Sequence, residues 1–235
     1  MVTRQELKAA VETALALSLS GRYSTLARPT DLYEAALFAI MLRAAEQAGG
    51  TVLVTNDGRT PTRDVRFRTG PGVLASGDEY TFAVVTFPPT SERCEQKLEV
   101  HLGIAFAGRS GICHECDIAI LTHAEAKRVR TGKRKYPSAR ALIAAVEAKF
   151  LVRGPVLGDG RNLIGLGSEL RLGKFRLVAP TNGSDALRTL LAHWACGFFE
   201  ELIPGSAAAL ELEDEVHETI QDWLSRRRRR VVAAV

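Results

Sequence analysis

The chain has 235 residues, of which 46% are hydrophobic and 25% charged, and its formal net charge is +4; this balance excludes an intrinsically disordered protein. No apolar stretch approaches the roughly 20 residues that a membrane-spanning helix needs, so we expect no membrane partner. Glu6 and Glu12 precede the short apolar stretch near the N-terminus, which argues against a signal peptide. The four cysteines lack a disulfide-like spacing, and together these features predict a cytoplasmic protein.

The basic residues are segregated from the acidic ones along the chain. The longest acid-free basic stretch contains Lys127, Arg128, Arg130, Lys133, Arg134, Lys135 and Arg140. Two further clusters consist of Arg59, Arg63, Arg66 and Arg68, and of Arg226 to Arg230. Any one cluster could be solvated surface, but such segregation is typical of a polyanion-binding face. The three together predict a nucleic-acid partner, which we expect the first stretch to bind.

The first part of the chain predicts two helices followed by a β-rich segment. Four hydrophobic residues recur at helical spacing within residues 5–19. A second helix begins at Pro29-Thr30-Asp31 and ends at Gly49-Gly50. Three strands are then expected, and they form a β-rich insert over about 51–90; their ranges are 51–55, 63–69 and 80–87.

The second part of the chain predicts alternating strands and helices. Residues 98–108 and 112–121 are expected to form an antiparallel hairpin, because a tight glycine-containing link joins them. The remaining elements are a strand over 141–151, a helix over 157–171, a strand over 175–179, a helix over 184–203 with an aromatic stripe that packs in the core, and a last helix over roughly 208–224 before the arginine tail. The order of elements predicts a mixed α/β core.

Two neighbouring strands of this core each carry charged residues on one face. Side chains alternate across a strand, so Glu147 and Lys149 share a face, and so do Glu115 and Asp117. If the two strands are adjacent, Asp117 and Glu147 converge with Lys149 beside them. Two carboxylates repel unless a cation lies between them, and oxygen ligands select hard ions such as Mg²⁺ or Mn²⁺. The alternative is a buried Glu147–Lys149 ion pair that Asp117 helps to satisfy.

Asp117, followed thirty residues later by Glu147-Ala148-Lys149 and embedded with it in strands, resembles the motif of the PD-(D/E)XK superfamily of restriction-endonuclease-like nucleases. The resemblance implies a metal ion held by Asp117, Glu147 and the carbonyl of Ala148, with Lys149 as the catalytic lysine. Many members add an acid from the first core helix, and here Glu34 fits that position. The alternative for Glu34 is a first-turn acid favoured by the helix dipole.

The family's core is a helix, a three-stranded meander, a helix and a further strand, an order similar to that of residues 30 to about 180. We therefore expect a restriction-endonuclease-like core with a mixed β-sheet flanked by helices. The implied organisation is an N-terminal helix and linker over 1–29, a nuclease domain over 30–205 that includes the insert, and a C-terminal helix and arginine tail over 206–235. Cys116 stands where the motif's name has proline, a position that the family varies.

The resemblance implies a Mg²⁺- or Mn²⁺-dependent nuclease that hydrolyses phosphodiester bonds, with DNA favoured over RNA, in defence against foreign DNA or in repair. It is compatible with a homodimer, because cutting both strands of a duplex usually requires two active sites. The alternative is a catalytically inactive nucleic-acid-binding module of the same fold.

Two other signals are weaker. Cys113 and Cys116 form a C-x-x-C that could bind zinc together with Cys94, His101 or His123, but strand alternation would point its two cysteines to opposite faces. His101 shares a face with Glu99 and could border the active site, although a core or surface histidine is the commoner case.

Overall fold

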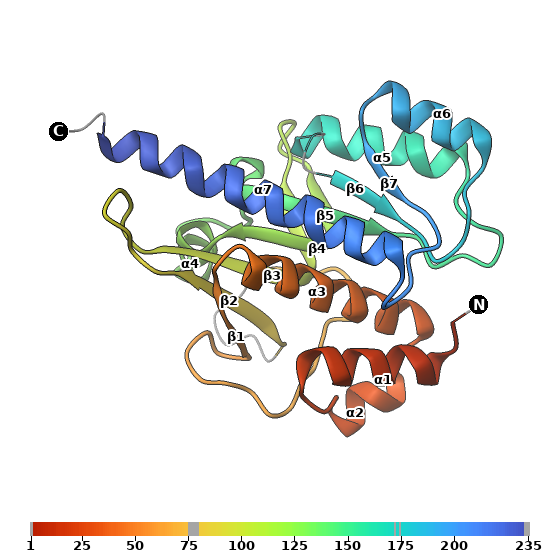
Figure 1. Ribbon diagram of the computed structural model, residues 1–235, viewed down its shortest axis with the longest axis horizontal. Coiled ribbons are helices and arrows are strands. Elements are labelled where there is room, and N and C mark those ends of the chain that lie inside the picture. Colours follow the sequence, from red (N-terminus) through yellow and green to blue (C-terminus); the bar gives the residue numbers. More distant parts are fainter. Residues whose placement is uncertain (1, 75–79, 172, 174, 233–235) are drawn as a thin grey trace.

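The computed structural model describes residues 2–74, 80–171, 173 and 175–232. It has an α/β architecture in which helices flank a seven-stranded mixed sheet (Figure 1), and this part of the sequence-based prediction is confirmed. In chain order the strands are β1 (Thr51–Thr55), β2 (Phe82–Phe87), β3 (Gln96–Ala107), β4 (Cys113–Thr122), β5 (Leu142–Ala148), β6 (Phe175–Val178) and β7 (Gly197–Phe199).

The strands lie in the sheet in the same order as in the chain. The first five form an antiparallel meander, in which each strand pairs with the next. The last three are parallel, since β5 pairs with β6 and β6 with β7. A parallel connection needs a crossover, and the chain supplies a helix for each: α5 (Leu157–Leu170) between β5 and β6, and α6 (Asp185–His193) between β6 and β7.

Two layers of helices cover the two faces of the sheet. One hydrophobic core lies beneath α1 (Arg4–Leu15), α3 (Pro29–Gln47) and α7 (Ala207–Val232). A second core lies on the opposite face, beneath α4 (His123–Arg130), α5 and α6. Two short helical segments complete the fold, α2 (Gly21–Leu26) and a 3₁₀ turn (Ala139–Ala141). Because α1 and α7 share a core with α3, the two ends of the chain pack on the same body as its middle.

The sheet bends sharply at Gly103 in β3. Val100 and Leu102 lie in the core beneath α3 and α7, whereas Ile104 and Phe106 lie in the core on the opposite face. The bend falls at Gly103, whose backbone is left-handed with φ 56°, a conformation that side chains other than that of glycine rarely adopt. As a result, the outer half of the β3–β4 hairpin curves over the face that carries α5.

The adjacent strand β4 changes faces at the same level. Ile118 and Ile120 lie in the core beneath α3 and α7, but Cys116 lies in the opposite core. Asp117 is therefore at the point where β4 passes from one face to the other. Strict alternation along β4 would place Cys116, Ile118 and Ile120 on one face, but this alternation does not survive the bend.

The β-rich segment over 51–90 is continuous with the main sheet rather than separate from it, because β2 pairs directly with β3. The predicted strand over 63–69 was wrong: only Val65 forms an isolated bridge there, with Leu19. Val65 and Phe67 are nevertheless buried, so the alternating pattern reflects the burial of these side chains and not the pairing of a strand.

The predicted helix over 184–203 was also wrong in its second half. Helix α6 ends at His193, Ala195 has a left-handed φ of 50°, and β7 follows at Gly197. The aromatic stripe is broken as a result, and the side chain of Trp194 is 48% exposed. The arginine tail, by contrast, continues helix α7 as far as Val232. Among the described residues, no helix has both the length and the apolar character needed to cross a membrane.

The bend at Gly103 yields a stability prediction. A Cβ at this position would lie 3.0 Å from the carbonyl oxygen of Gly70, in addition to the cost of the left-handed backbone. We expect Gly103→Ala to lower the free energy of unfolding by about 2–4 kcal/mol, since backbone strain and overpacking add.

The matched control is Gly111→Ala, because Gly111 also has a left-handed backbone but its Cβ would meet open space. This substitution should cost only about 1–2 kcal/mol. Urea denaturation of both variants tests the difference, and equal losses would show that the bend does not depend on the close approach to Gly70.

Candidate active site

Four of the residues that the sequence singled out come together where the end of β5 lies beside the middle of β4. Ile118 faces Val146 across the pair, which makes Asp117 and Glu147 the next positions in the register. The backbone N–H of Ala148 donates a hydrogen bond to Oδ2 of Asp117 at 2.8 Å. Lys149 Nζ lies 2.6 Å from Oε1 of Glu147. Asp117, Glu147, Ala148 and Lys149 thus form one contiguous group, which we call the carboxylate cluster together with Glu115.

The strand ends fix these side chains in place. Strand β5 is shorter than predicted and ends at Ala148, so Lys149 lies just beyond it. The backbone N–H of Lys149 still donates to the carbonyl of Val178 in β6, at 2.9 Å, which holds the lysine against the sheet. Val146 packs in the core beneath α3, and alternation places Glu147 on the opposite side of β5.

Two carboxyl groups of the cluster, Asp117 and Glu115, have raised pKa values. Burial and the charge of Glu147 raise the pKa of Asp117 to about 7, although the hydrogen bond from Ala148 and the charge of Lys149 oppose the shift. Burial and Glu147 also raise the pKa of Glu115, against the effect of Lys149. The negative charge at this point therefore exceeds what the lysine alone balances.

The pKa of Lys149 is also raised, which for a lysine favours the charged form. Burial acts to lower its pKa, but the charge and hydrogen bond of Glu147, together with the charges of Asp117 and Asp159, outweigh burial and raise it. The ammonium is thus firmly charged. It is held among carboxylates that come from β4, β5 and the first turn of α5.

Glu34 approaches the cluster from helix α3. Burial raises its pKa to about 8, and the charges of Asp117, Asp31 and Glu115 add to this effect while Arg28 opposes it. Glu34 is thus a largely buried helix acid within range of the charge of Asp117. A glutamate with this pKa carries its proton at neutral pH for much of the time.

The donor atoms of the cluster suit a hard cation in their chemistry. Asp117 and Glu147 supply carboxylate oxygens, Ala148 supplies a backbone carbonyl, and oxygen ligands of this kind are those that Mg²⁺ and Mn²⁺ prefer. The geometry is incomplete, however, because no three His, Cys, Asp or Glu side chains of the described residues stand ready as a metal-binding group. The carboxylate of Glu147 forms an ion pair with Lys149 instead.

The basic stretch from 127 to 140 connects β4 to β5. Its first part belongs to helix α4, and Arg128 and Arg134 form ion pairs with the buried Glu125 at 3.3 and 3.5 Å. Arg130 donates two hydrogen bonds to Glu99, so its guanidinium group is engaged within the fold. The members that remain exposed without such a role are Lys127, Lys133, Lys135 and Arg140.

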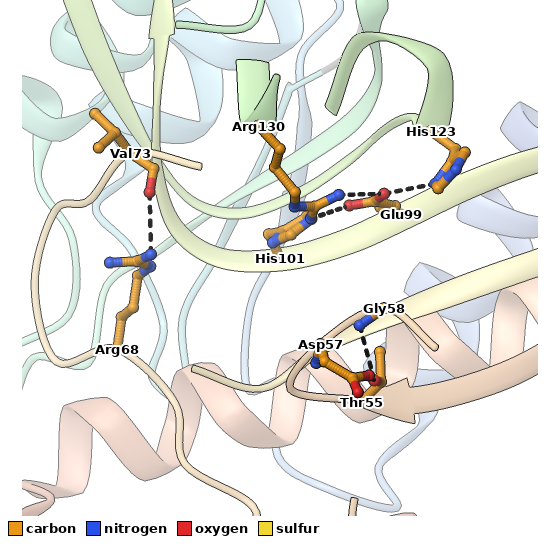
Figure 2. A network of polar contacts seen from close by, with 9 residues as sticks. All are labelled: Thr55, Asp57, Gly58, Arg68, Val73, Glu99, His101, His123 and Arg130. Carbon is orange, nitrogen blue, oxygen red and sulfur yellow. Dashed lines mark hydrogen bonds and ion pairs between the residues drawn. The ribbon is translucent and has the colours of Figure 1, made fainter. Parts of the chain in front are cut away.

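Glu99 is the centre of a polar network that sequence analysis missed (Figure 2). Its side chain is fully buried in β3, and Arg130 reaches it with two hydrogen bonds of 2.8 and 2.6 Å. His101 Nε2 and His123 Nδ1 lie 2.7 and 2.6 Å from the same carboxylate. The ring of Phe82 stacks on the ring of His101, and the guanidinium group of Arg130 lies over the Phe82 ring.

His101 belongs to the Glu99 network. Its partner across the β3–β4 pair is Ala119, two residues along β4 from Asp117. The only sequence signal was the shared face of Glu99 and His101, because the partners His123 and Arg130 come from a helix that sequence analysis did not predict.

The cysteines give no support to a zinc site. All four are free; Cys113 is exposed and Cys116 is buried. Their different environments agree with the expected divergence of the two side chains.

Comparisons with known proteins add no relative: no family model matches the sequence, and neither a curated protein nor a solved structure is significantly similar to it. The function must therefore be inferred from the site itself.

The Glu99 network yields a second stability prediction. Burial acts to raise the pKa of Glu99, but hydrogen bonds from Arg130, His101 and His123 outweigh burial and hold the pKa well below its usual range. Glu99→Gln should lower the free energy of unfolding by about 3 kcal/mol at neutral pH, because it leaves Arg130 without its counter-charge. The exposed ion pair of Glu95 gives a control, Glu95→Gln, which should change stability by less than about 1 kcal/mol.

The same carboxylate predicts a pH dependence. A depressed folded-state pKa contributes stability that is fully present above the unfolded value of about 4.3 and is lost as pH falls toward the folded value. The gap between wild type and Glu99→Gln should therefore be constant from pH 7 to about 5 and shrink below about 4. Denaturant titrations across this range measure it, and a gap that stays constant down to pH 3 would contradict the assignment.

Proposed function

We propose that this protein is a metal-dependent nuclease with a restriction-endonuclease-like core, which hydrolyses phosphodiester bonds of DNA. The element order supports the proposal: helix α3, the meander of β3, β4 and β5, helix α5 and strand β6 follow one another as in the core of the family that the motif resembles. A role in defence against foreign DNA or in repair, and a homodimer for cutting both strands, follow from that resemblance alone.

One observation carries the proposal. The Asp117 carboxylate accepts a hydrogen bond from Ala148, at the point where Glu147 and Lys149 leave the adjacent strand. Two acids and a lysine from neighbouring strand ends are thus joined by direct contacts, although thirty residues of chain separate Asp117 from Glu147. Such a group has the composition that phosphodiester hydrolysis requires, namely oxygen ligands beside a fixed positive charge.

Each residue then has a role. Asp117, Glu147 and the carbonyl of Ala148 would hold Mg²⁺ or Mn²⁺. When bound, such a cation would supply Lewis-acid chemistry to the phosphodiester. Lys149, fixed by Glu147 and by its backbone hydrogen bond to Val178, stabilises negative charge that develops on the phosphate. Glu34 is within range of the charge of Asp117 and would bind water at the edge of the site.

The second candidate is a catalytically inactive nucleic-acid-binding module of the same fold. The observation in its favour is the direct Glu147–Lys149 ion pair of 2.6 Å, which satisfies both charges without a metal ion. The two candidates differ in what a divalent cation does to the protein.

Cleavage of DNA tests the enzyme directly. Wild-type protein should nick and linearise supercoiled plasmid DNA with millimolar Mg²⁺ or Mn²⁺, and EDTA should stop the reaction. Lys149→Ala should reduce the rate about 100-fold or more, because it removes charge stabilisation at the phosphate. Lys8→Ala removes a lysine from α1 and serves as the control. A folded Lys149→Ala protein that cuts at the wild-type rate would refute the role of this lysine.

Thermal unfolding separates the two candidates. A cation that binds only the folded state raises the melting temperature by mass action, and we expect an increase of several degrees in millimolar Mn²⁺. Asp117→Asn should remove most of this increase and should itself stabilise the metal-free protein, because it deletes one of the repelling charges. Glu211→Gln, at an exposed position, is the control. A wild-type melting curve that Mn²⁺ leaves unmoved would favour the inactive module.

A further inference from the structure

Two adjoining hollows in the surface are lined by arginines. The first, of about 670 Å³, is lined by Arg109, Arg140 and Arg171 together with Ser138 and small residues. The second shares Arg140 and Arg171 and continues to Arg226 and Arg227. We call this continuous feature the arginine groove, and its members are Arg109, Arg140, Arg171, Arg226 and Arg227.

The groove is assembled by the fold and not by a local run of charge. Arg109 lies in the turn of the β3–β4 hairpin, Arg140 in the 3₁₀ turn before β5, and Arg171 at the C-terminal end of α5. Arg226 and Arg227 come from the last part of α7. The bend of the β3–β4 hairpin brings its turn to α5, where the backbone N–H of Arg109 donates to the carbonyl of Glu169 at 3.1 Å. Four distant segments thus contribute arginines to one surface.

Three of these arginines have no counter-charge. Among the residues that the structure describes, no carboxylate forms an ion pair with Arg109, Arg140 or Arg171. The nearby carboxylate of Glu169 is occupied, because it accepts hydrogen bonds from the backbone N–H and hydroxyl of Ser110 at 2.9 and 2.8 Å. Like charges that converge without a partner raise the local positive potential and attract an anion.

The other two arginines are only loosely engaged. Arg226 forms an ion pair with Asp222 at 3.2 Å, but both side chains are 69% exposed, so the pair is weak. Arg227 lies over the ring of Trp223, with 5.3 Å between the guanidinium carbon and the ring centroid. Both guanidinium groups keep donors free to contact a ligand.

Arg171 also has an unusual backbone. Its φ of 103° is a conformation that side chains other than that of glycine rarely adopt. Glycine would be the ordinary residue at such a helix end. That an arginine stands there is consistent with a use for its side chain in the groove.

The lining residues indicate what the groove binds. A guanidinium group presents a planar fork of donors that matches two oxygens of a phosphate. Apart from the arginines, the first hollow is lined by small residues such as Ala107, Gly108 and Ala139, and the described lining contains no Asn or Gln of the kind that reads base edges. The composition therefore fits a sugar–phosphate backbone, and a comparison of unrelated sequences tests whether the arginines also read base edges.

The groove is remote from the carboxylate cluster. Arg140 precedes β5 and Glu147 lies near its end. Two steps of 3₁₀ turn at about 2.0 Å and five steps of strand at about 3.3 Å place them about 20 Å apart along the chain. This distance corresponds to about six base pairs of duplex DNA.

We propose that the arginine groove binds the phosphodiester backbone of duplex DNA without regard to sequence, outside the site of cleavage. The proposal rests on the proposed function for the choice of DNA as the polyanion. Binding can be measured without catalysis, so the two proposals fail separately.

The test is fluorescence anisotropy with labelled duplexes of about 20 base pairs and two unrelated sequences, in EDTA and across a series of NaCl concentrations. In the triple variant Arg109→Gln/Arg140→Gln/Arg171→Gln, affinity should fall at least about tenfold on both sequences. The slope of log affinity against log salt should become shallower by about 2–3, since each lost phosphate contact contributes about 0.9.

Two further variants keep this test decisive. Lys8→Gln/Lys97→Gln removes two positive charges from α1 and β3, outside the basic clusters, and should retain affinity within about threefold of wild type. Arg226→Gln/Arg227→Gln removes the other half of the groove without touching the strained backbone of Arg171, and should also weaken binding on both sequences.

The proposal is overturned if both groove variants bind like wild type, or lose no more affinity than the control variant. It is also overturned if inorganic phosphate, at matched ionic strength, displaces the duplex far better than NaCl does, because the groove would then be a site for an isolated anion. If groove-dependent binding holds but plasmid is never cut with Mg²⁺ or Mn²⁺, the groove survives and the nuclease assignment fails.

Discussion

Three carboxylates and one ammonium crowd together where the end of β5 lies beside the middle of β4, and the repulsion among the carboxylates is the constraint on which the proposed chemistry depends. The charge of Glu147 raises the pKa values of Glu115 and Asp117, in addition to the effect of burial, while Lys149 balances one charge. A folded chain gains nothing in stability from such an arrangement, because replacing one acid with a neutral residue would relieve it. Sites that oppose stability in this way are where function is expected.

Glu99 is a buried acid of the same fold whose charge is balanced by protein side chains alone. Glu99 is fully buried, yet Arg130, His101 and His123 all contact its carboxylate, and its pKa is held low. Asp117, in contrast, has one backbone donor and charged neighbours that oppose its ionisation. The difference between a satisfied acid and an unsatisfied one distinguishes a structural ion cluster from a candidate cation site.

The sheet geometry explains why the charges converge. Gly103 allows β3 to change faces, and β4 follows it at Asp117. One consequence is that Asp117 faces Glu147 and is also close to Glu34 on α3. The other is that the hairpin turn reaches the C-terminal end of α5, which builds the arginine groove. The carboxylate cluster and the groove thus depend on the same bend.

Sequence patterns predicted the elements whose residues alternate or recur without interruption, and these include α3, the β3–β4 hairpin and β5. They also singled out Asp117, Glu147 and Lys149, because charges within apolar strands are conspicuous. They failed where burial and backbone pairing separate, as at Val65 and Phe67, which are buried but form no strand. Contacts between distant segments, such as Glu99 with Arg130, leave no local pattern to find.

The central claim is that Asp117 and Glu147 bind a divalent cation, and anomalous X-ray diffraction tests it most directly. Crystals grown in millimolar MnCl₂ and measured at the manganese absorption edge should show a peak between the two carboxylates and the carbonyl oxygen of Ala148. The ligand distances should be within about 0.3 Å of the 2.1 Å usual for Mg²⁺, and Lys149 should have moved off Glu147. A map with no peak there, and with the Glu147–Lys149 ion pair intact, would contradict the account.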